Sequence, residues 1–294
     1  MIKKNIAKFI PTNFLKIYLT IKHVISNYKN ISKFAELERK VNKNVELNDI
    51  EFEEFEEFLS SIPENFQTYV DIGAADGVNA SCTLKLAKDK KWSGVCFEFG
   101  DISNISYIYR NFENVNICKV KIVPDNIANL LKSYNIPKYF GFLNLDIDSY
   151  DYFVIKKILE SNYRPYLISM EINEKIPPPL EFYVKFDDNF QFVGDHFYGC
   201  SLTSANNLLT KFGYKLKHLT RNNALFLNSE FFDFNERSVA EIYNQGYVNL
   251  KNRKEIFWYN NDIDNVLDLP IEEAMEFINN KFKNYKGKFH LSIS

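Results

Sequence analysis

Short apolar runs alternate with longer amphipathic segments in the middle of this sequence, and this alternation constrains the fold more than any other feature. Five apolar runs are predicted to be strands, at residues 68–73, 94–99, 115–123, 140–148 and 165–173. The segments between them carry apolar residues at helical spacing, around residues 79–90, 103–112, 126–134 and 151–161. Strands that alternate with helices in this way form βαβ units, in which helices cover both faces of a parallel sheet.

The pattern changes after the fifth predicted strand. Three consecutive prolines at residues 177–179 open a loop, and a helix is predicted near residues 203–212. Two further strands are predicted at residues 214–220 and 223–228, joined by a tight turn at Arg221-Asn222. Because no helix lies between these two strands, they are expected to form an antiparallel edge. The sequence therefore predicts an α/β fold with a mostly parallel seven-stranded sheet.

Helical sequence flanks this region on both sides. We expect an N-terminal helical extension over residues 1–62, a core domain over residues 63–230 and a C-terminal helical extension over residues 231–294. The first thirty residues are basic and amphipathic, which predicts a surface helix or a peripheral membrane contact. An acidic stretch follows at residues 46–57, in which phenylalanines recur at helical spacing. This spacing predicts a solvated helix with one buried stripe.

Composition argues against several classes of protein. The chain has 294 residues, with 36 basic and 38 acidic side chains, so it lacks the basic surplus of a nucleic-acid-binding protein. No apolar stretch reaches the ~20 residues that a transmembrane helix needs. The four cysteines form no C-x-x-C pair, which fits a protein of the reducing cytoplasm. Aromatic residues make up 16%, and their rings are expected to fill the core, line a ligand site or form a subunit interface.

A turn with two carboxylates and two glycines follows the first predicted strand. It reads Asp71-Ile72-Gly73-Ala74-Ala75-Asp76-Gly77 and precedes a helix, which is where open α/β sheets bind ligands. The two glycines are expected to let the backbone approach a ligand. The G-x-G-x-x-G pattern of dinucleotide-binding proteins is absent, and the carboxylates would repel a pyrophosphate. The turn therefore favours a cofactor that carries positive charge, such as an amino group or a sulfonium.

Glu98 ends the second predicted strand, 27 residues after Asp71. An acidic side chain at this place can accept hydrogen bonds from both ribose hydroxyls of an adenosine. Together, the segments VDIGAADG and CFE resemble the cofactor site of class I S-adenosylmethionine-dependent methyltransferases. The resemblance implies a Rossmann-like fold and S-adenosylmethionine as the cofactor. The residues that would hold this cofactor are Asp71, Gly73, Ala74, Asp76, Gly77 and Glu98.

Polar side chains gather at the predicted carboxyl ends of the fourth and fifth strands. Alternation along a strand places Asp146 and Asp148 on one face, and it does the same for Glu171 and Asn173. Like charges at short range need a cation or a proton between them. A divalent metal would satisfy this need, with His196 as an added ligand if the metal is iron-like. Two alternatives stay open, namely metal-free catalysis with an Asp or His base and helix capping by some of the acids.

A second resemblance is more specific. The segment LNLDIDSYD resembles the L-K-I-D-V-E-G segment of FkbM-type O-methyltransferases, with Asp146 and Asp148 at the two acidic positions. The segments MEINEKIPPP, HFYGCSL, FGYKL and NALFL are similar to sugar-modifying methyltransferases encoded with bacterial capsule and surface-polysaccharide genes. The match covers roughly residues 68–228. It implies methyl transfer to a hydroxyl of a nucleotide-activated sugar such as GDP-heptose.

An analogy with metal-dependent catechol-type methyltransferases, which take metal ligands from the ends of these same strands, implies roles for individual residues. Asp146, Glu171 and Asn173 would be ligands of Fe²⁺, Mg²⁺ or Mn²⁺. Asp148 and His196 would each be a further ligand or the base, so that Asp146, Asp148 and His196 form the catalytic set.

Several points remain open at this stage. Lys175 is expected either to pair with a substrate phosphate or to lie in solvent. Two rival functions are a nicotinamide-dependent oxidoreductase, which the missing third glycine disfavours, and a non-catalytic partner subunit. The aromatic C-terminal segment is expected to cover the active site or to form a homo-oligomer interface.

Overall fold

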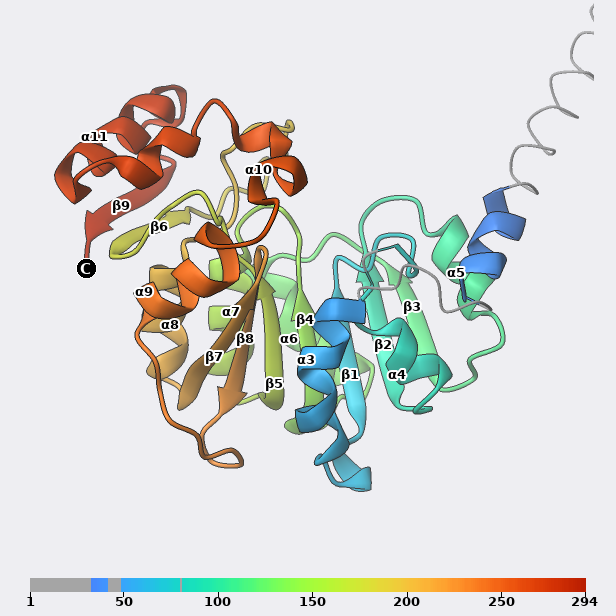
Figure 1. Ribbon diagram of the computed structural model, residues 1–294. Coiled ribbons are helices and arrows are strands. Elements are labelled where there is room, and N and C mark those ends of the chain that lie inside the picture. Colours follow the sequence, from blue (N-terminus) through green and yellow to red (C-terminus); the bar gives the residue numbers. More distant parts are fainter. Residues whose placement is uncertain (1–32, 42–48, 80) are drawn as a thin grey trace, which may run out of the picture.

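A computed structural model describes residues 33–41, 49–79 and 81–294 of the chain. A seven-stranded sheet forms its centre (Figure 1). Its strands are β1 (Thr68–Ile72), β2 (Ser93–Glu98), β3 (Val115–Lys119), β4 (Tyr139–Leu145), β5 (Arg164–Glu171), β7 (Tyr214–Thr220) and β8 (Asn223–Asn228). Each of the seven predicted strands is present. The apolar, β-branched and aromatic side chains of these short runs suit a sheet that is buried on both faces.

The strand order in this sheet is β3-β2-β1-β4-β5-β8-β7. The first five of these strands pair in parallel, whereas β8 is antiparallel to β5 and β7 is antiparallel to β8. The tight turn between β7 and β8 carries Arg221 at a φ of 59°. The predicted fold is therefore confirmed: the protein has a Rossmann-like α/β fold with a mostly parallel seven-stranded sheet and an antiparallel edge.

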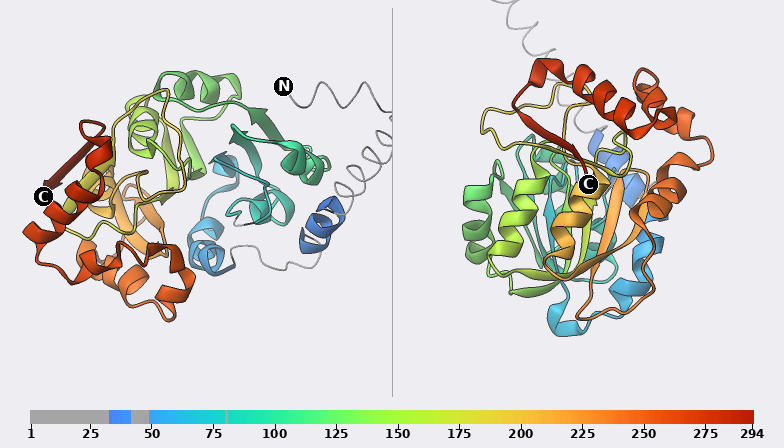
Figure 2. Two further views of the ribbon diagram at one scale, coloured as in Figure 1. Left: turned by 90° about the horizontal axis from the view of Figure 1, so that it is seen from above. Right: turned by 90° about the vertical axis from the view of Figure 1, so that its left-hand side faces the viewer.

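Helices cover both faces of the sheet, as the right-hand view of Figure 2 shows. One face carries α6 (Pro124–Ser133), α7 (Asp151–Glu160) and α8 (Leu202–Thr210), and the other carries α3 (Asp49–Ser60), α4 (Leu84–Lys88) and α5 (Ser103–Tyr109). Alternate residues of each strand supply the two cores; Val70 and Ile72 face the first group of helices, and Tyr69 faces the second.

The acidic segment before the core contributes directly to the second face. Phe55 and Leu59 of α3 are each 1% exposed, and Phe55 packs against Phe142 of β4 with ring centroids 5.9 Å apart. This confirms the buried stripe predicted for that segment. The predicted basic helix of the first thirty residues lies outside the described residues. In the part of the chain that the structure covers, no helix has the length and apolar character needed to cross a membrane.

The C-terminal segment differs from the prediction at its end. It contains α9 (Val239–Tyr243), α10 (Arg253–Ile256) and α11 (Ile271–Lys281), but it closes with strand β9 (Phe289–Ile293). β9 pairs antiparallel with β6 (Leu180–Val184), a strand that the sequence analysis read as loop. The alternation of Phe289, Leu291 and Ile293 is typical of a strand, but the segment is too short for a reliable period. The description of residues 231–294 as wholly helical was therefore wrong.

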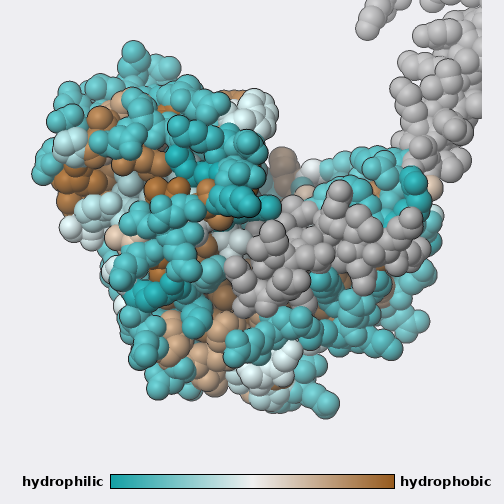
Figure 3. All heavy atoms as spheres, in the orientation of Figure 1, coloured by the Kyte–Doolittle hydropathy of each residue, from teal (hydrophilic) through white to brown (hydrophobic). Residues whose placement is uncertain are grey.

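These C-terminal elements form a separate small core above the carboxyl ends of the parallel strands (Figure 1). It contains Phe182 of β6, Phe197 of the loop between β6 and α8, and Phe282 after α11, all at most 2% exposed. The face of the molecule seen in Figure 3 is mostly hydrophilic, with hydrophobic atoms gathered near α11. The high aromatic content thus fills this second core as well as the main one.

Candidate active site

Asp71 lies beneath the turn that follows β1. Its carboxylate accepts hydrogen bonds from Thr83 Oγ1 at 2.6 Å and from Asn144 Nδ2 at 2.9 Å, and the residue is 2% exposed. Burial raises the pKa of Asp71, and the two hydrogen bonds oppose that shift. Above it, the Gly73 N–H donates to the Phe97 carbonyl oxygen at 2.9 Å, which ties the turn to β2. Asp71 therefore links β1 to β4 and to Thr83, the residue before α4.

Both glycines of the turn are required by packing within the protein. Gly73 has a φ of +87°, and a Cβ there would lie 1.6 Å from the carbonyl oxygen of Asp146. Gly77 has a φ of +73°, and a Cβ there would lie 2.7 Å from Ile105 and 2.9 Å from Tyr109. Gly73 allows the turn after β1 to lie directly against the backbone after β4. The expectation that these glycines let the backbone approach a ligand stays a prediction.

The carboxylates around this turn hold its backbone. Glu98 accepts hydrogen bonds from the N–H groups of Ala75 at 2.8 Å and Gly100 at 2.5 Å. Asp76 accepts from the N–H of Asn79 at 2.8 Å and so caps the next turn. Each carboxylate oxygen has two lone pairs, so Glu98 retains capacity to accept hydrogen bonds from a ligand.

A first cavity of about 410 Å³ opens at the carboxyl ends of β1, β2 and β4. Gly73 and Glu98 line it, as predicted for a cofactor site, whereas the other four predicted residues do not: Asp71, Ala74, Asp76 and Gly77. Apolar side chains complete its wall, including Phe97, Phe99, Ile122 and Ile147. The first cavity thus combines an apolar wall with an acidic group that accepts hydrogen bonds.

Three carboxylates meet at one end of the first cavity. Asp146, Asp148 and Glu171 each offer an oxygen, and these atoms lie within 4.8 Å of one another. Asp148 has a φ of 52°, and the loop that contains it is fixed by Asp151, whose carboxylate accepts from the N–H groups of Ile147 and Ser149 at 3.0 Å each. Asp151, at the start of α7, therefore holds the loop and leaves Asp148 free to face the site.

The pKa values of these three carboxylates are all raised. Burial raises the pKa of Asp146 to about 8, with further contributions from the charges of Asp148 and Asp151. Burial raises the pKa of Glu171 well above its usual range, with the charge of Asp146 as the next cause. Burial also raises the pKa of Asp148, and the nearby charge of Lys175 lowers it. The group is therefore unfavourable when fully ionised, unless a cation or protons compensate for it.

Glu171 also has an unsatisfied atom. Its Oε1 accepts a hydrogen bond from Asn222 Nδ2 at 2.8 Å, whereas its buried Oε2 has no partner among the described residues. Buried carboxylate oxygens are rarely left without a partner. Three carboxylate groups with one such oxygen fit a divalent cation that prefers oxygen ligands.

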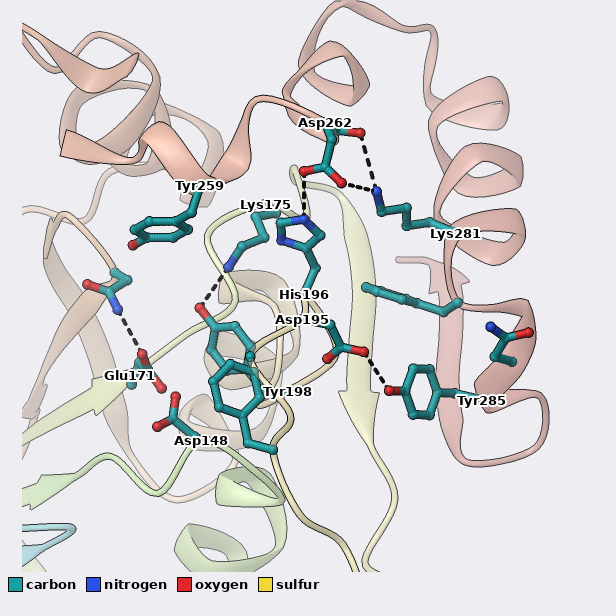
Figure 4. A pocket seen from close by; sticks show the side chains of 15 residues that line it. Asp148, Glu171, Lys175, Asp195, His196, Tyr198, Tyr259, Asp262, Lys281 and Tyr285 are labelled. Carbon is teal, nitrogen blue, oxygen red and sulfur yellow. Dashed lines mark hydrogen bonds and ion pairs between the residues drawn. The ribbon is translucent and has the colours of Figure 1, made fainter. Parts of the chain in front are cut away.

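The two remaining predicted ligands differ in their surroundings. Asn173 follows the end of β5, and its Nδ2 donates to the carbonyl oxygens of His196 and Tyr198 at 2.9 and 3.0 Å. Its Oδ1 is buried without a partner among the described residues, so its assignment to the ligand set stays a prediction. The His196 ring faces away from the carboxylates, and its Nε2 lies 2.9 Å from Asp262 Oδ1 (Figure 4). The structure therefore does not bring His196 into this group.

A second cavity of about 750 Å³ lies between the sheet and the C-terminal segment (Figure 4). Asp148 and Glu171 line its inner end, together with Lys175, Tyr198 and Asn222. Its outer wall includes Asp195, His196, Tyr259, Asp262, Lys281 and Tyr285. Asp148 lines both cavities, so the carboxylate group stands where the two meet.

The sequence analysis missed most of the second cavity's outer wall. Asp262 bridges Lys281 at 2.5 Å and His196, and Tyr285 donates a hydrogen bond to Asp195 at 2.5 Å. No local motif marks these residues. Asn222 could have been found, because β8 is antiparallel to β5 and the turn before β8 therefore lies beside the carboxyl end of β5.

No family model and no curated protein matches this chain. Among solved structures, a SAM-dependent methyltransferase from Aquifex aeolicus is 12% identical, with 64% of this chain and 94% of that chain covered and a TM-score of 0.36. The CurJ carbon methyltransferase is 9% identical, with 61% and 53% covered and a TM-score of 0.40. The O-methyltransferase NcsB1 from neocarzinostatin biosynthesis, solved with SAM and a naphthoic acid, is 9% identical, with 61% and 55% covered and a TM-score of 0.35.

This chain therefore spans about half the length of the CurJ and NcsB1 chains. At these identities and TM-scores the likeness concerns the fold alone. The arrangement of the site itself can bring two small molecules together, because two cavities adjoin at one group of carboxylates. Such a geometry suits the transfer of a group from a donor in one cavity to an acceptor in the other.

Proposed function

We propose that this protein is an S-adenosylmethionine-dependent O-methyltransferase. The observation that carries the proposal is the position of Asp148, which lines both cavities beside Asp146 and Glu171. The first cavity would hold the methyl donor, with Glu98 accepting hydrogen bonds from its ribose hydroxyls. The second cavity would hold the acceptor, with its hydroxyl at the carboxylate group.

The turn after β1 and Asp148 would have separate roles in the reaction. The turn after β1, fixed by Gly73 and Asp71, would position the donor so that its methyl group faces the second cavity. Alignment of this kind contributes about 7–11 kcal/mol to bimolecular reactions. Asp148 would accept the proton of the acceptor hydroxyl, because its pKa is raised above that of an ordinary Asp and it faces both cavities.

A divalent cation fits the three carboxylates. The cation would be held by Asp146, Asp148 and Glu171. It would also provide a partner for the buried Oε2 of Glu171. When bound, a cation at this place would lower the pKa of the acceptor hydroxyl. Without one, the pKa of about 8 at Asp146 would keep that carboxyl protonated near neutral pH, and Asp148 would be the remaining base.

The acceptor would be a sugar, as the resemblance to surface-polysaccharide methyltransferases implies. Tyr198 and Tyr259 line the second cavity, and aromatic rings of this kind pack against the apolar face of a sugar ring. The nucleotide of a nucleotide-activated sugar such as GDP-heptose would extend toward the outer wall. The two lysines of this cavity are both paired with carboxylates, Lys175 with Glu174 and Lys281 with Asp262. A diphosphate would therefore have to compete for them.

Titration calorimetry with S-adenosylhomocysteine tests the first half of the proposal. The wild type is expected to bind it, and Glu98→Gln is expected to weaken binding about 10- to 100-fold, because hydrogen bonds to a charged group contribute about 1.5–3 kcal/mol. Asp101→Asn is a matched control, since Asp101 is a nearby carboxylate that caps α5 through Ser103 and does not line the first cavity. No binding by the wild type would refute the proposal.

Methyl-transfer assays with GDP-heptose, with and without Mg²⁺, Mn²⁺ or Fe²⁺, test the second half. Turnover that a chelator abolishes and a divalent cation restores would support the metal site. Turnover that is unchanged by the chelator would leave Asp148 as a metal-free base. Transfer to nitrogen or carbon acceptors alone would contradict the assignment to oxygen.

A further inference from the structure

A buried ion pair lies at the inner end of the second cavity. Lys175 Nζ is 3.0 Å from Glu174 Oε1, and their side chains are 3% and 0% exposed. Lys175 also donates to the Tyr198 hydroxyl at 2.9 Å, which in turn donates to Glu174 Oε2 at 2.8 Å. Asn260 Nδ2 donates to Glu174 Oε1 at 2.8 Å. Of the two alternatives that the sequence left open for Lys175, a position in solvent is therefore ruled out.

Stability does not explain this pair. Lysine and glutamate are almost never fully buried unless they are paired, and a buried pair is often no more stable than apolar side chains of similar volume. The three residues Glu174, Lys175 and Tyr198 come from two segments that approach each other beyond the end of β5. Lys175 lines the same cavity as Asp148 and Glu171, and its side chain points along the cavity toward Tyr198 (Figure 4).

The ammonium group is fixed, with one donor unused. A lysine ammonium has three N–H donors, and Glu174 and Tyr198 accept two of them. The described residues provide no third acceptor for Lys175. These two partners already order the flexible Lys175 side chain. Little further side-chain entropy is therefore lost when a ligand accepts the third hydrogen bond.

We propose that Lys175 determines acceptor specificity by donating a hydrogen bond to a hydroxyl adjacent to the one that is methylated. The acceptor is thus a vicinal diol, with one hydroxyl at Asp148 and the other at Lys175. This inference rests on the proposed methyl transfer. Glu174 and Tyr198 are positioning residues that hold the ammonium in place.

The charge of the inner cavity favours a neutral hydroxyl over an anion at this position. Three carboxylates, from Asp146, Asp148 and Glu171, lie at this end of the cavity, and Glu174 neutralises Lys175. A carboxylate or phosphate on the neighbouring atom would meet this acidic surrounding at short range. A hydroxyl accepts the hydrogen bond from Lys175 without adding charge.

The test compares acceptors with and without the second hydroxyl. Initial rates are measured with labelled S-adenosylmethionine and a panel of vicinal diols, namely GDP-heptose, GDP-mannose and the free sugars, together with their monodeoxy analogues. The wild type is expected to prefer the diol over the analogue that lacks the neighbouring hydroxyl by about 10- to 100-fold in kcat/KM. Lys175→Met is expected to abolish that preference, because kcat/KM falls for the diol and stays the same for the deoxy analogue.

Two further variants separate specificity from folding. Lys175→Met leaves Glu174 buried without its counter-ion, so the double variant Lys175→Met/Glu174→Gln removes both charges and is expected to show the same loss of preference in a stable protein. Lys281→Met is the matched control, because Lys281 lines the outer wall of the same cavity and is paired with Asp262. It is expected to keep the wild-type ratio between diol and deoxy acceptors.

The outcomes distinguish the proposed role of Lys175 from the proposed methyltransferase function. Equal losses on diol and deoxy acceptors in the double variant would overturn the inference and leave Lys175 with a structural role. Binding of S-adenosylhomocysteine without transfer to any diol of the panel would overturn it too. Failure of the wild type to bind S-adenosylhomocysteine would instead refute the proposed function.

Discussion

The two cavities are built in different ways. The first cavity is lined by residues from the loops after β1, β2, β3 and β4, all between Gly73 and Asp148. The second draws its residues from the end of β5, the loop before α8, the turn before β8 and the C-terminal segment up to Tyr285. The first follows from the strand–helix alternation, because parallel strands bring their carboxyl ends to one edge. The second depends on contacts between segments that are up to 90 residues apart.

The two regions also differ in how their charges are balanced. In the second cavity, Lys281 and His196 are paired with Asp262 of the same wall, and Lys175 is paired with Glu174, which is buried behind the wall. At the border of the first cavity, Asp146, Asp148 and Glu171 stand together with one buried oxygen unpartnered within the described part of the chain. His196 and Lys281 of the outer wall are thus paired within the protein, whereas the carboxylate group requires a proton or a cation from outside.

The largest effect is expected at the carboxylate group. Glu171→Gln keeps the shape of the side chain but removes its charge, and we expect kcat/KM for methyl transfer to fall by about 10²- to 10³-fold, comparable to the loss of a group that stabilises charge in the transition state. Glu181→Gln is the matched control, since Glu181 lies on β6 and accepts from Asn207 outside both cavities. Full activity in Glu171→Gln would refute a role for the group in the reaction.

The same group predicts an unusual dependence of stability on pH. Asp146 has a pKa of about 8 in the folded protein, against 3.8 for an unperturbed Asp, so the folded state binds more protons between these values. The free energy of unfolding is therefore highest below about pH 4 as far as this group is concerned, and falls as pH rises toward about 8. Asp262, with a pKa lowered to about 2, contributes its opposite dependence only at lower pH.

Thermal unfolding in a chelator at pH 5, 6.5 and 8 measures this effect. We expect the melting temperature to fall with pH in the wild type and to fall less steeply in Glu171→Gln. Added Mg²⁺ is expected to raise it more at pH 8 than at pH 5, because protons compete with the cation for the carboxylates. A flat profile in the chelator would show that the carboxylates are balanced within the protein.

A smaller effect, on the free energy of unfolding, is expected from replacing one glycine in each of the two cavities. Gly73→Ala is expected to cost about 3 kcal/mol of unfolding free energy, because it combines a left-handed φ with a clash against the Asp146 carbonyl oxygen. Gly194→Ala, in the wall of the second cavity, has a φ of +80° but no atom within 4 Å of its Cβ, so we expect about 1 kcal/mol. Urea unfolding measures both. Equal costs would contradict the tight contact between the first turn and β4.

The sequence predicted the sheet well because its signals are local. Each predicted strand is a short apolar run, and each of Gly73, Glu98, Asp146 and Asp148 lies at or just beyond the end of one. Glu171 was predicted to lie beside Asp146 and Asp148 because it ends the adjacent strand β5. These placements need only the alternation of elements and the rule that parallel strands end at one edge.

The errors have a common physical reason. Asn173 was assigned by strand alternation and His196 as an imidazole ligand of an iron-like metal, but beyond the end of β5 the backbone no longer alternates, and tertiary contacts decide where each side chain points. Asn173 holds the carbonyl oxygens of His196 and Tyr198, and His196 meets Asp262, 66 residues later. The burial of Lys175 and the strand β9 were missed for the same reason, since Tyr198 lies 23 residues after Lys175 and β6 is distant from β9 in the sequence.

The smallest effect is expected at the outer wall of the second cavity. Asp262 is 63% exposed and pairs with both Lys281 and His196. Exposed ion pairs contribute about 0–1 kcal/mol, so Asp262→Asn is expected to lower the free energy of unfolding by about 0.5 kcal/mol and to leave the affinity for S-adenosylhomocysteine unchanged. Urea unfolding and calorimetry measure the two quantities. A loss above about 2 kcal/mol would mean that this cluster attaches the C-terminal segment to the core, and the apolar contacts of Phe182, Phe197 and Phe282 would then be insufficient to do so.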